Sequence, residues 1–175
     1  MPEPHLPVVP VAERQTLRAI SLNLWGEQAP LDRRLALCCE GLRALQPDVI
    51  ALQEVRQVPG SVPNTAQTLA DALQLGCVFQ KTVAWGGGDE GLALLSRFPI
   101  VASGHVPLPH PMPDLADERI LLWAIVDSGA GPVLIGSTHL TYRMTHGIQR
   151  EDQVLALDAA ANELMQKYKP AVTVL

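Results

Sequence analysis

Three polar side chains occur at or near the ends of apolar, strand-like runs: Asn23, Glu54 and His139. Glu54 ends the run Val49–Gln53, and an unpaired carboxylate on a buried strand would be very costly. Carboxylate and carboxamide oxygens are hard ligands that suit Mg²⁺ or Mn²⁺. An imidazole can donate a hydrogen bond or a proton to a phosphate oxygen or leaving group. Together these groups predict metal-assisted attack on a phosphate ester.

Each of the three residues also has a simpler explanation. Glu54 can be the charge that marks where its strand reaches the surface, and Asn23 can satisfy backbone groups near a turn. A histidine on a strand, such as His139, is often only a hydrogen-bonded core residue. In favour of a site, ligands collect at the strand ends of α/β sheets. Taken alone, the residues leave both interpretations open.

The elements expected to position these residues begin with a β-α-β unit over residues 17–55. Residues 17–25 alternate as a strand, with Ser21, Asn23 and Trp25 on one face. Apolar residues then recur at spacings of four and three from Leu31 to Leu45, which predicts a helix packed on a sheet. The Glu54 strand follows, and its nearly unbroken apolar run is typical of a strand covered on both faces. Its pairing with the first strand is expected to be parallel.

The remaining elements follow from similar patterns. Asn64 is expected to cap a second helix, with Leu69, Ala72 and Leu73 facing inward. Strands are expected over residues 77–85, 91–96, 100–106, 120–126 and 133–141, with Gly86-Gly87-Gly88 as a hairpin turn. A last helix is expected from about residue 148 to 167, with these side chains facing inward: Val154, Leu157, Ala161, Leu164 and Tyr168. Residues 171–175 have the composition of a central strand.

Length and composition indicate one globular domain. The 175 residues are 47% hydrophobic and 18% charged, an ordinary globular balance. We expect a proline-rich, extended lead-in over residues 1–15 and a single domain over residues 16–175. The net charge of −5 argues against a protein that grips nucleic acid mainly through its phosphates. Three cysteines indicate no disulfide framework and favour a reduced, cytoplasmic compartment, and no apolar run approaches the roughly 18 residues of a membrane span.

Four segments resemble, in order, motifs of the endonuclease/exonuclease/phosphatase superfamily: Ser21–Trp25, Ala51–Val55, Gly91–Ile100 and Ser137–Leu140. Arg150 and Gln153 also resemble an Arg-x-x-Gln feature of that family, and the resemblance runs from about Leu17 to Leu175. The family includes deoxyribonucleases, abasic-site endonucleases, sphingomyelinases and inositol polyphosphate 5-phosphatases. The resemblance implies an α/β fold, a layered sandwich of the deoxyribonuclease type.

The resemblance also implies roles for the three strand-end residues. Glu54 corresponds to the principal Mg²⁺ (or Mn²⁺) ligand, and Asn23 would lie beside it at the metal and the phosphate. His139 matches a strand histidine that contacts the scissile phosphate in several branches. Asn23, Glu54 and His139 are therefore the expected catalytic set, with Glu54 and Asn23 at the metal.

Further residues carry weaker expectations. Arg119 loosely resembles a residue that some branches place near the substrate, although a solvated strand start is its simpler interpretation. Tyr142, Arg143 and His146 could line a substrate groove, or form a solvated loop. Arg97 is expected to bond loop carbonyls.

The sequence departs from the family in one respect. Its Gly-Asp-x-Asn motif, expected directly after a strand like residues 171–175, and its Ser-Asp-His motif are both absent. The resemblance therefore implies a C-terminally truncated domain with an incomplete second sheet, and a 175-residue chain that is itself inactive.

Three functions follow as alternatives. The first is a divalent-metal phosphoesterase present as a partial chain, and the second is a non-catalytic binding module that keeps the fold. The third is an assembly, because an unfinished sheet edge invites self-association. Nucleic acid, phospholipid and inositol phosphate all remain possible substrates, with the acidic balance arguing mildly against nonspecific DNA cleavage.

Overall fold

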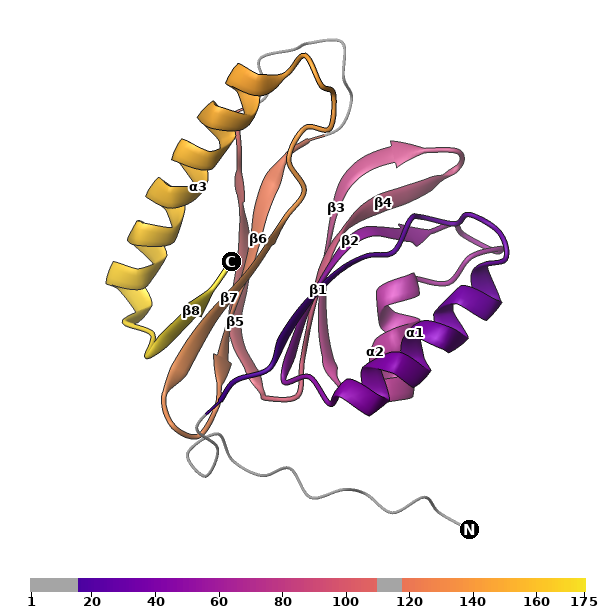
Figure 1. Ribbon diagram of the computed structural model, residues 1–175, viewed down its shortest axis with the longest axis horizontal. Coiled ribbons are helices and arrows are strands. Elements are labelled where there is room, and N and C mark those ends of the chain that lie inside the picture. Colours follow the sequence, from indigo (N-terminus) through magenta and orange to yellow (C-terminus); the bar gives the residue numbers. More distant parts are fainter. Residues whose placement is uncertain (1–15, 110–117) are drawn as a thin grey trace.

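Two four-stranded sheets pack face to face, with helices on their outer faces (Figure 1). The computed structural model describes residues 16–109 and 118–175. The first sheet has the order β1 (Ala19–Asn23), β2 (Val49–Gln57), β4 (Gly88–Ser96) and β3 (Gly76–Trp85). The second has the order β5 (Ile100–Pro107), β6 (Ile120–Asp127), β7 (Pro132–Thr138) and β8 (Val172–Val174). Helices α1 (Leu31–Leu45) and α2 (Thr65–Leu73) cover the first sheet, and α3 (Gly147–Tyr168) covers the second, which confirms the layered α/β sandwich.

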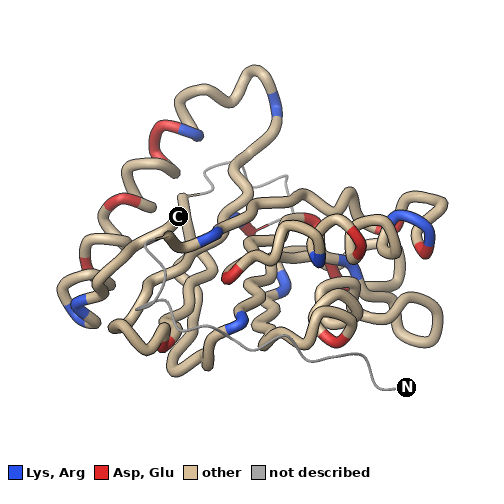
Figure 2. The backbone as a smooth tube through the Cα atoms, turned by 60° about the horizontal axis from the view of Figure 1, so that its bottom comes forward, with Lys and Arg blue, Asp and Glu red and all other residues tan. Residues whose placement is uncertain are grey.

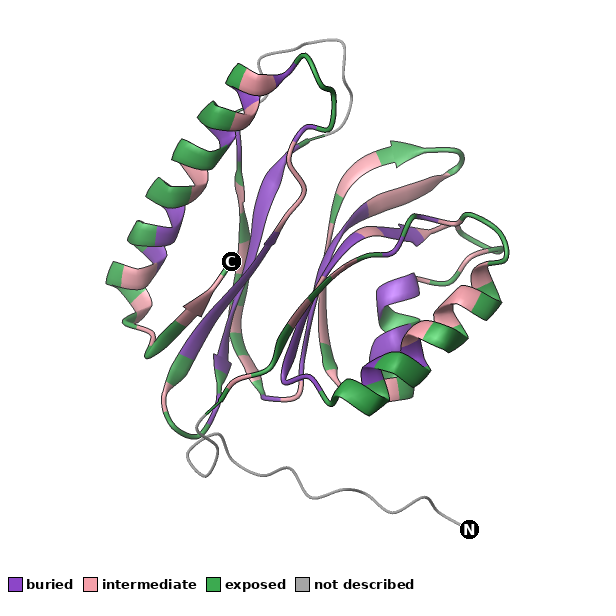
Figure 3. Cartoon of the chain, in the orientation of Figure 1, coloured by how far each residue is buried: buried purple, intermediate pink, exposed green. Residues whose placement is uncertain are grey.

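Strand β2 is buried on both faces, as its apolar run predicts. Ile50 and Leu52 pack into the cluster under α1 and α2, and Val49 packs into the cluster between the sheets. Figure 3 shows the buried residues gathered along the central strands of both sheets. An apolar run without alternation is what such a doubly covered strand requires.

The β1–α1–β2 unit has the expected parallel pairing, with Ala19 opposite Val49 and Asn23 opposite Gln53. Because β1 and β2 run in the same direction, their carboxyl ends meet at one edge of the sheet. The α2 cap is also confirmed, since Asn64 Oδ1 accepts hydrogen bonds of 3.0 Å from the Ala66 and Gln67 amides. Among the described residues, no helix is long and apolar enough to cross a membrane.

Several expected positions are wrong in detail. Ala72 and Val154 are exposed, and the buried stripe of α3 includes Gln153 with Ala160, Ala161 and Leu164. The polar Gln153 replaces Val154 on the inner face because two loop backbones bond to it. The segment 171–175 was expected to be central, yet β8 pairs with β7 alone among the described strands and lies at the sheet edge. The expected lead-in over residues 1–15 lies outside the described residues.

A polar contact joins the two sheets beneath the edge where β1, β2 and β7 end. Gln53 Nε2 donates to Ser21 Oγ at 3.3 Å and to Ser137 Oγ at 3.0 Å. Gln53 and Ser137 are both buried, so these hydrogen bonds fix the ends of three strands relative to one another. The residues that follow these strands are thereby held close in space.

Candidate active site

Glu54 lies on a β-bulge inside β2, which continues to Gln57, so the expected position of Glu54 at the end of its strand is wrong. Leu52 pairs with Ala93 and Val55 with Gly91, so Gln53 and Glu54 together face a single residue of β4. Glu54 has a φ of 52°, in the left-handed region that residues other than glycine seldom adopt. Such a conformation costs about 1–3 kcal/mol and persists only where the surrounding structure imposes it. The bulge breaks the strand's alternation, and the Glu54 carboxylate meets Asn23 of β1.

Gly91, which pairs with Val55 just after the bulge, lets β3 approach β4 closely. A Cβ atom at Gly91 would clash with the carbonyl oxygen of Gln80 on β3. The Gly91 of the Gly91–Ile100 motif therefore permits the β3–β4 contact next to Glu54.

Asn23 orients the carboxylate. Its Nδ2 donates to Glu54 Oε1 at 2.8 Å, and its Oδ1 accepts from the Trp25 backbone N–H at 2.8 Å. The two bonds fix which end of the Asn23 amide faces Glu54. Asn23 thus holds the carboxylate through its Nδ2–H group, while its Oδ1 is taken up by the Trp25 backbone amide.

Glu54 and His139 line one cavity of about 260 Å³ between the two sheets. The first sheet also contributes Trp85 and Glu90, and the second contributes Arg119 and Tyr142. His139 directly follows β7, which ends at Thr138 rather than at the expected Thr141. The structure therefore brings Glu54 and His139 to one cavity, whereas Asn23 bonds Glu54 and is not among the described residues that line the cavity.

Arg119 is buried, so its interpretation as a solvated strand start is wrong. The residue is 8% exposed, and its Nη1 donates to the His139 carbonyl at 2.9 Å. The Arg119 carbonyl in turn accepts from the Leu108 N–H at 2.7 Å. Because the start of β6 is covered by the segment after β7, the guanidinium is held beneath His139 in the cavity wall.

Gln153 of α3 fixes the segment after β7. Gln153 Oε1 accepts from the Thr141 N–H at 3.1 Å, and its Nε2 donates to the Pro109 carbonyl at 3.0 Å. Arg150 Nη1 donates to the Thr141 carbonyl at 3.2 Å and to the Arg143 carbonyl at 2.7 Å. The Arg-x-x-Gln feature is therefore a clamp between α3 and the segment that carries His139.

The loop residues expected near a substrate groove separate into three cases. His146 is buried, with its Nδ1 3.1 Å from Thr141 Oγ1, so its interpretation as part of a solvated loop is wrong. Tyr142 lines the cavity and is 68% exposed. Arg143 is exposed, and it is not among the described residues that line the cavity. Arg97 bonds the Pro47 carbonyl at 3.4 Å, as expected.

The sequence model of the Endonuclease/Exonuclease/phosphatase family matches residues 20–165. The chain belongs to this family. A search of curated proteins finds no match. The family assignment confirms the resemblance carried by the Asn23, Glu54 and His139 motifs.

Solved structures share the fold. An endonuclease/exonuclease/phosphatase from Beutenbergia cavernae superposes with a TM-score of 0.67 at 26% identity, covering 80% of this chain and 42% of that one. The human Nocturnin catalytic domain with bound sulfate anion superposes with a TM-score of 0.68 at 22% identity. The match covers 86% of this chain and 59% of that one. TDP2 from Caenorhabditis elegans superposes with a TM-score of 0.66 at 20% identity, and the match covers 86% of this chain and 44% of that one. The chain thus spans about half the length of the solved structures that it matches.

Glu90 is a cavity residue that the sequence motifs of this family member do not mark. Burial raises the pKa of its carboxyl, the hydrogen bond from Trp85 Nε1 opposes that rise, and the nearby Glu54 charge adds to it. More weakly, Arg56 and Arg119 lower the pKa. Glu90 shares a strand face with Leu92 and Leu94, which pack between the sheets. A carboxylate in register with these apolar residues is the sequence signal that could have identified Glu90 as a site residue.

The residues present suit a hard cation. Over residues 16–109 and 118–175, no three His, Cys, Asp or Glu side chains converge as a metal cluster. Mg²⁺ does not need one, because it keeps several waters and commonly binds through one or two carboxylates plus substrate phosphates. Glu54 supplies the carboxylate of this donor set. The Asn23 amide turns its Nδ2 to Glu54 and its Oδ1 to the Trp25 N–H, so it would have to rotate to join Glu54 as an oxygen ligand.

Proposed function

We propose that this family member is a divalent-metal-dependent phosphoesterase. The observation that carries the proposal is the placement of Glu54: a strained bulge and the Asn23 hydrogen bond hold its carboxylate, and Glu54 lines the same cavity as His139. Strained backbone that points a charged group at a shared cavity is typical of functional sites.

Charge in the cavity supports a cation requirement. Glu54, Glu90 and Glu118 line it, against a single arginine, Arg119. A phosphate entering these surroundings would be repelled by the carboxylates. A bound Mg²⁺ or Mn²⁺ would reverse that balance and polarise the phosphoryl oxygens.

The protein's own residues then have separate tasks. Glu54 and Asn23 hold the cation, and His139 donates a hydrogen bond or proton to a phosphate oxygen or the leaving group. Arg119 holds the His139 backbone and adds positive charge in the cavity wall. Tyr142 is placed to contact the substrate, and Arg143 is a weaker candidate because it lies outside the cavity lining.

The substrate is proposed to be a phosphate ester, as for other hydrolases of the family. Figure 2 shows basic and acidic positions interspersed along the described backbone instead of gathered in one basic band, which disfavours binding dominated by nucleic-acid phosphates. Three free cysteines support a reduced, cytoplasmic compartment. We also propose that residues 1–175 alone turn over slowly and that β8 offers an edge for self-association.

Isothermal titration with Mg²⁺ and Mn²⁺ tests the proposal without depending on turnover. Glu54→Gln is expected to weaken Mn²⁺ binding at least about tenfold, because the charged ligand is lost. Glu118→Gln is the matched control, since Glu118 is an exposed carboxylate of the same cavity and its loss should change affinity by about twofold at most. Equal Mn²⁺ affinity in the wild type and Glu54→Gln would contradict the assignment. Phosphate binding without any metal binding would favour a non-catalytic module.

A further inference from the structure

The exposed aromatic side chains of this protein gather around the proposed site. Trp25, Trp85 and Tyr142 are its exposed aromatic residues, at 61%, 44% and 68%. Trp25 lies two residues after Asn23, and Trp85 and Tyr142 line the cavity from opposite sheets. Phe98 and Trp123 are instead buried in the packed cores. Aromatic rings left in solvent around a phosphate site need a reason, since burial would stabilise the fold.

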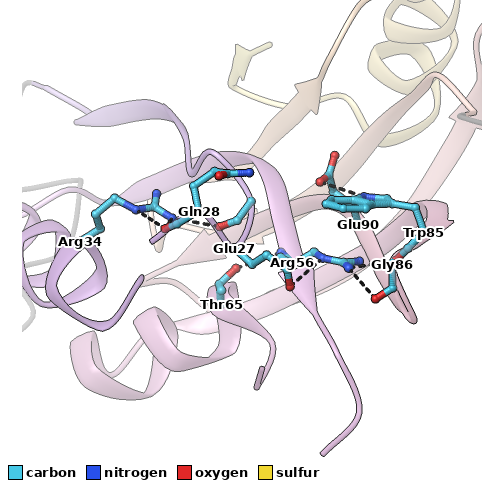
Figure 4. A network of polar contacts seen from close by, with 9 residues as sticks. Glu27, Gln28, Arg34, Arg56, Thr65, Trp85, Gly86 and Glu90 are labelled. Atoms are coloured by element: carbon cyan, nitrogen blue, oxygen red, sulfur yellow. Dashed lines mark hydrogen bonds and ion pairs between the residues drawn. The ribbon is translucent and has the colours of Figure 1, made fainter. Parts of the chain in front are cut away.

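Trp85 is held rigidly by Arg56. The Arg56 guanidinium carbon lies 4.1 Å from the centroid of the indole ring, and Arg56 Nη2 donates to the Trp85 carbonyl at 2.9 Å. On the ring edge, Trp85 Nε1 donates to Glu90 Oε2 at 3.3 Å. Figure 4 shows Arg56 extending from β2 toward Trp85, with the Glu90 carboxylate beside the nitrogen edge of the indole ring. The guanidinium covers one face of the indole, and Trp85 is still 44% exposed where it lines the cavity.

The cost of this arrangement indicates that the ring position matters. Arg56 is fully buried, and its charge is compensated by Glu27 at 3.3 Å from Nε. Gly86 has a φ of 55°, and a Cβ there would come within 3.0 Å of Arg56 Nη2. Glycine therefore suits the turn after Trp85, because a side chain there would be strained and would press on the guanidinium. A buried arginine that only tied down the hairpin would not require an exposed indole in the cavity wall.

We propose that Trp85 is a ring-stacking residue that selects phosphate esters carrying a nucleobase. The proposal rests on the proposed function and specifies its substrate class. Nucleobases stack on exposed aromatic faces irrespective of sequence, and Trp25 provides a further ring near the same edge for a neighbouring base. Phospholipid headgroups and inositol phosphates have no aromatic ring, so neither would use this surface.

Titration calorimetry of the 175-residue chain in the presence of Mn²⁺ separates the ring contribution from that of the phosphate. AMP is expected to bind about tenfold more tightly than ribose 5-phosphate, which has the same phosphate and sugar without the base. Trp85→Ala should remove this preference, and Trp85→Phe, which keeps a ring, should retain most of it. Circular dichroism confirms that each variant is folded.

Several outcomes would overturn the proposal. These are equal affinities of the wild type for the two compounds, no measurable binding of either, or a preference that survives in Trp85→Ala. Tighter binding of phosphotyrosine than of AMP would assign the surface to a different class of ligand and also overturns it. The Mn²⁺ affinity without nucleotide tests the proposed function separately, so failure of one is distinguishable from failure of the other.

Discussion

The two walls of the cavity are built in different ways. On the first sheet, Glu54 is positioned by backbone: a parallel register, a bulge and a left-handed φ. On the second sheet, His139 lies just beyond a regular strand, and the segment that follows it is fixed by the Gln153 side chain of α3. The first wall therefore carries local strain at the functional residue, and the second depends on contacts with residues distant in sequence. Changes in the two walls should have different consequences for stability and binding.

The largest effect is expected where the second wall loses its clamp. Gln153→Leu leaves the buried Thr141 N–H without its acceptor, while the carbonyl of the exposed Pro109 can bond water instead. One unsatisfied buried group should lower the unfolding free energy by about 1–3 kcal/mol. Urea denaturation measures this loss of unfolding free energy, with Gln166→Leu as the control on the exposed face of the same helix. Similar losses in both variants would mean that Gln153 is not a clamp.

On the first wall, Asn23→Ala should chiefly affect metal binding. Without the 2.8 Å bond the Glu54 carboxylate is no longer oriented, and Mn²⁺ affinity is expected to fall about tenfold. Asn162→Ala is a matched control, because Asn162 makes a similar amide–carboxylate bond to Asp158 at 3.2 Å on exposed α3. If calorimetry gives the same Mn²⁺ affinity for both variants, Asn23 has no positioning role.

Replacing the strained residue should stabilise the first wall. Glu54→Gly removes the penalty of a left-handed φ and is expected to raise unfolding free energy by about 1 kcal/mol while abolishing metal binding. Gln74→Gly offers a comparison, since Gln74 ends α2 with a φ of 57° and lies far from any proposed ligand role. The unfolding free energy of Gln74→Gly should rise by a similar amount, without any change in metal affinity. A destabilised Glu54→Gly would show that the side chain itself supports the bulge.

The smallest effect concerns Glu90 and depends on pH. Its raised pKa means that the folded protein binds this proton more tightly than the unfolded chain does. The resulting stabilisation is present below the ordinary carboxyl pKa of about 4.3 and is lost as pH rises through the raised value. Glu90→Gln stays neutral, so its melting temperature relative to wild type should increase between pH 4 and pH 7. The exposed Glu163→Gln should show no such trend, and a trend of opposite sign in Glu90→Gln would contradict the account.

The sequence predicts the first wall better than the second because local patterns encode it. Apolar periodicity locates β1, α1 and β2, and parallel pairing then places Asn23 beside Glu54. The bulge itself is not visible in the pattern, since two polar residues after an apolar run also fit a strand that ends there. Gly91 reports a different feature, the close approach of β3 to β4.

The second wall depends on tertiary contacts that no local pattern reports. Arg119 looks like the charged start of a strand, and its burial becomes clear only in the fold, where it bonds the carbonyl of His139. Gln153 lies next to Val154 on a helix, so periodicity favours the valine, although the loop backbones select the glutamine. Arg56 likewise follows a motif without belonging to it, and its burial against Trp85 requires the folded hairpin.

Paramagnetic broadening by Mn²⁺ in the isotope-labelled protein tests most directly whether both walls serve one cation. Glu54 and His139 line the same cavity, so added Mn²⁺ should broaden the resonances of residues near Glu54 and also those of His139 and Tyr142. In Glu54→Gln both sets should stay sharp at the same Mn²⁺ concentration. Broadening confined to the first sheet, or unchanged by Glu54→Gln, would contradict a shared metal site.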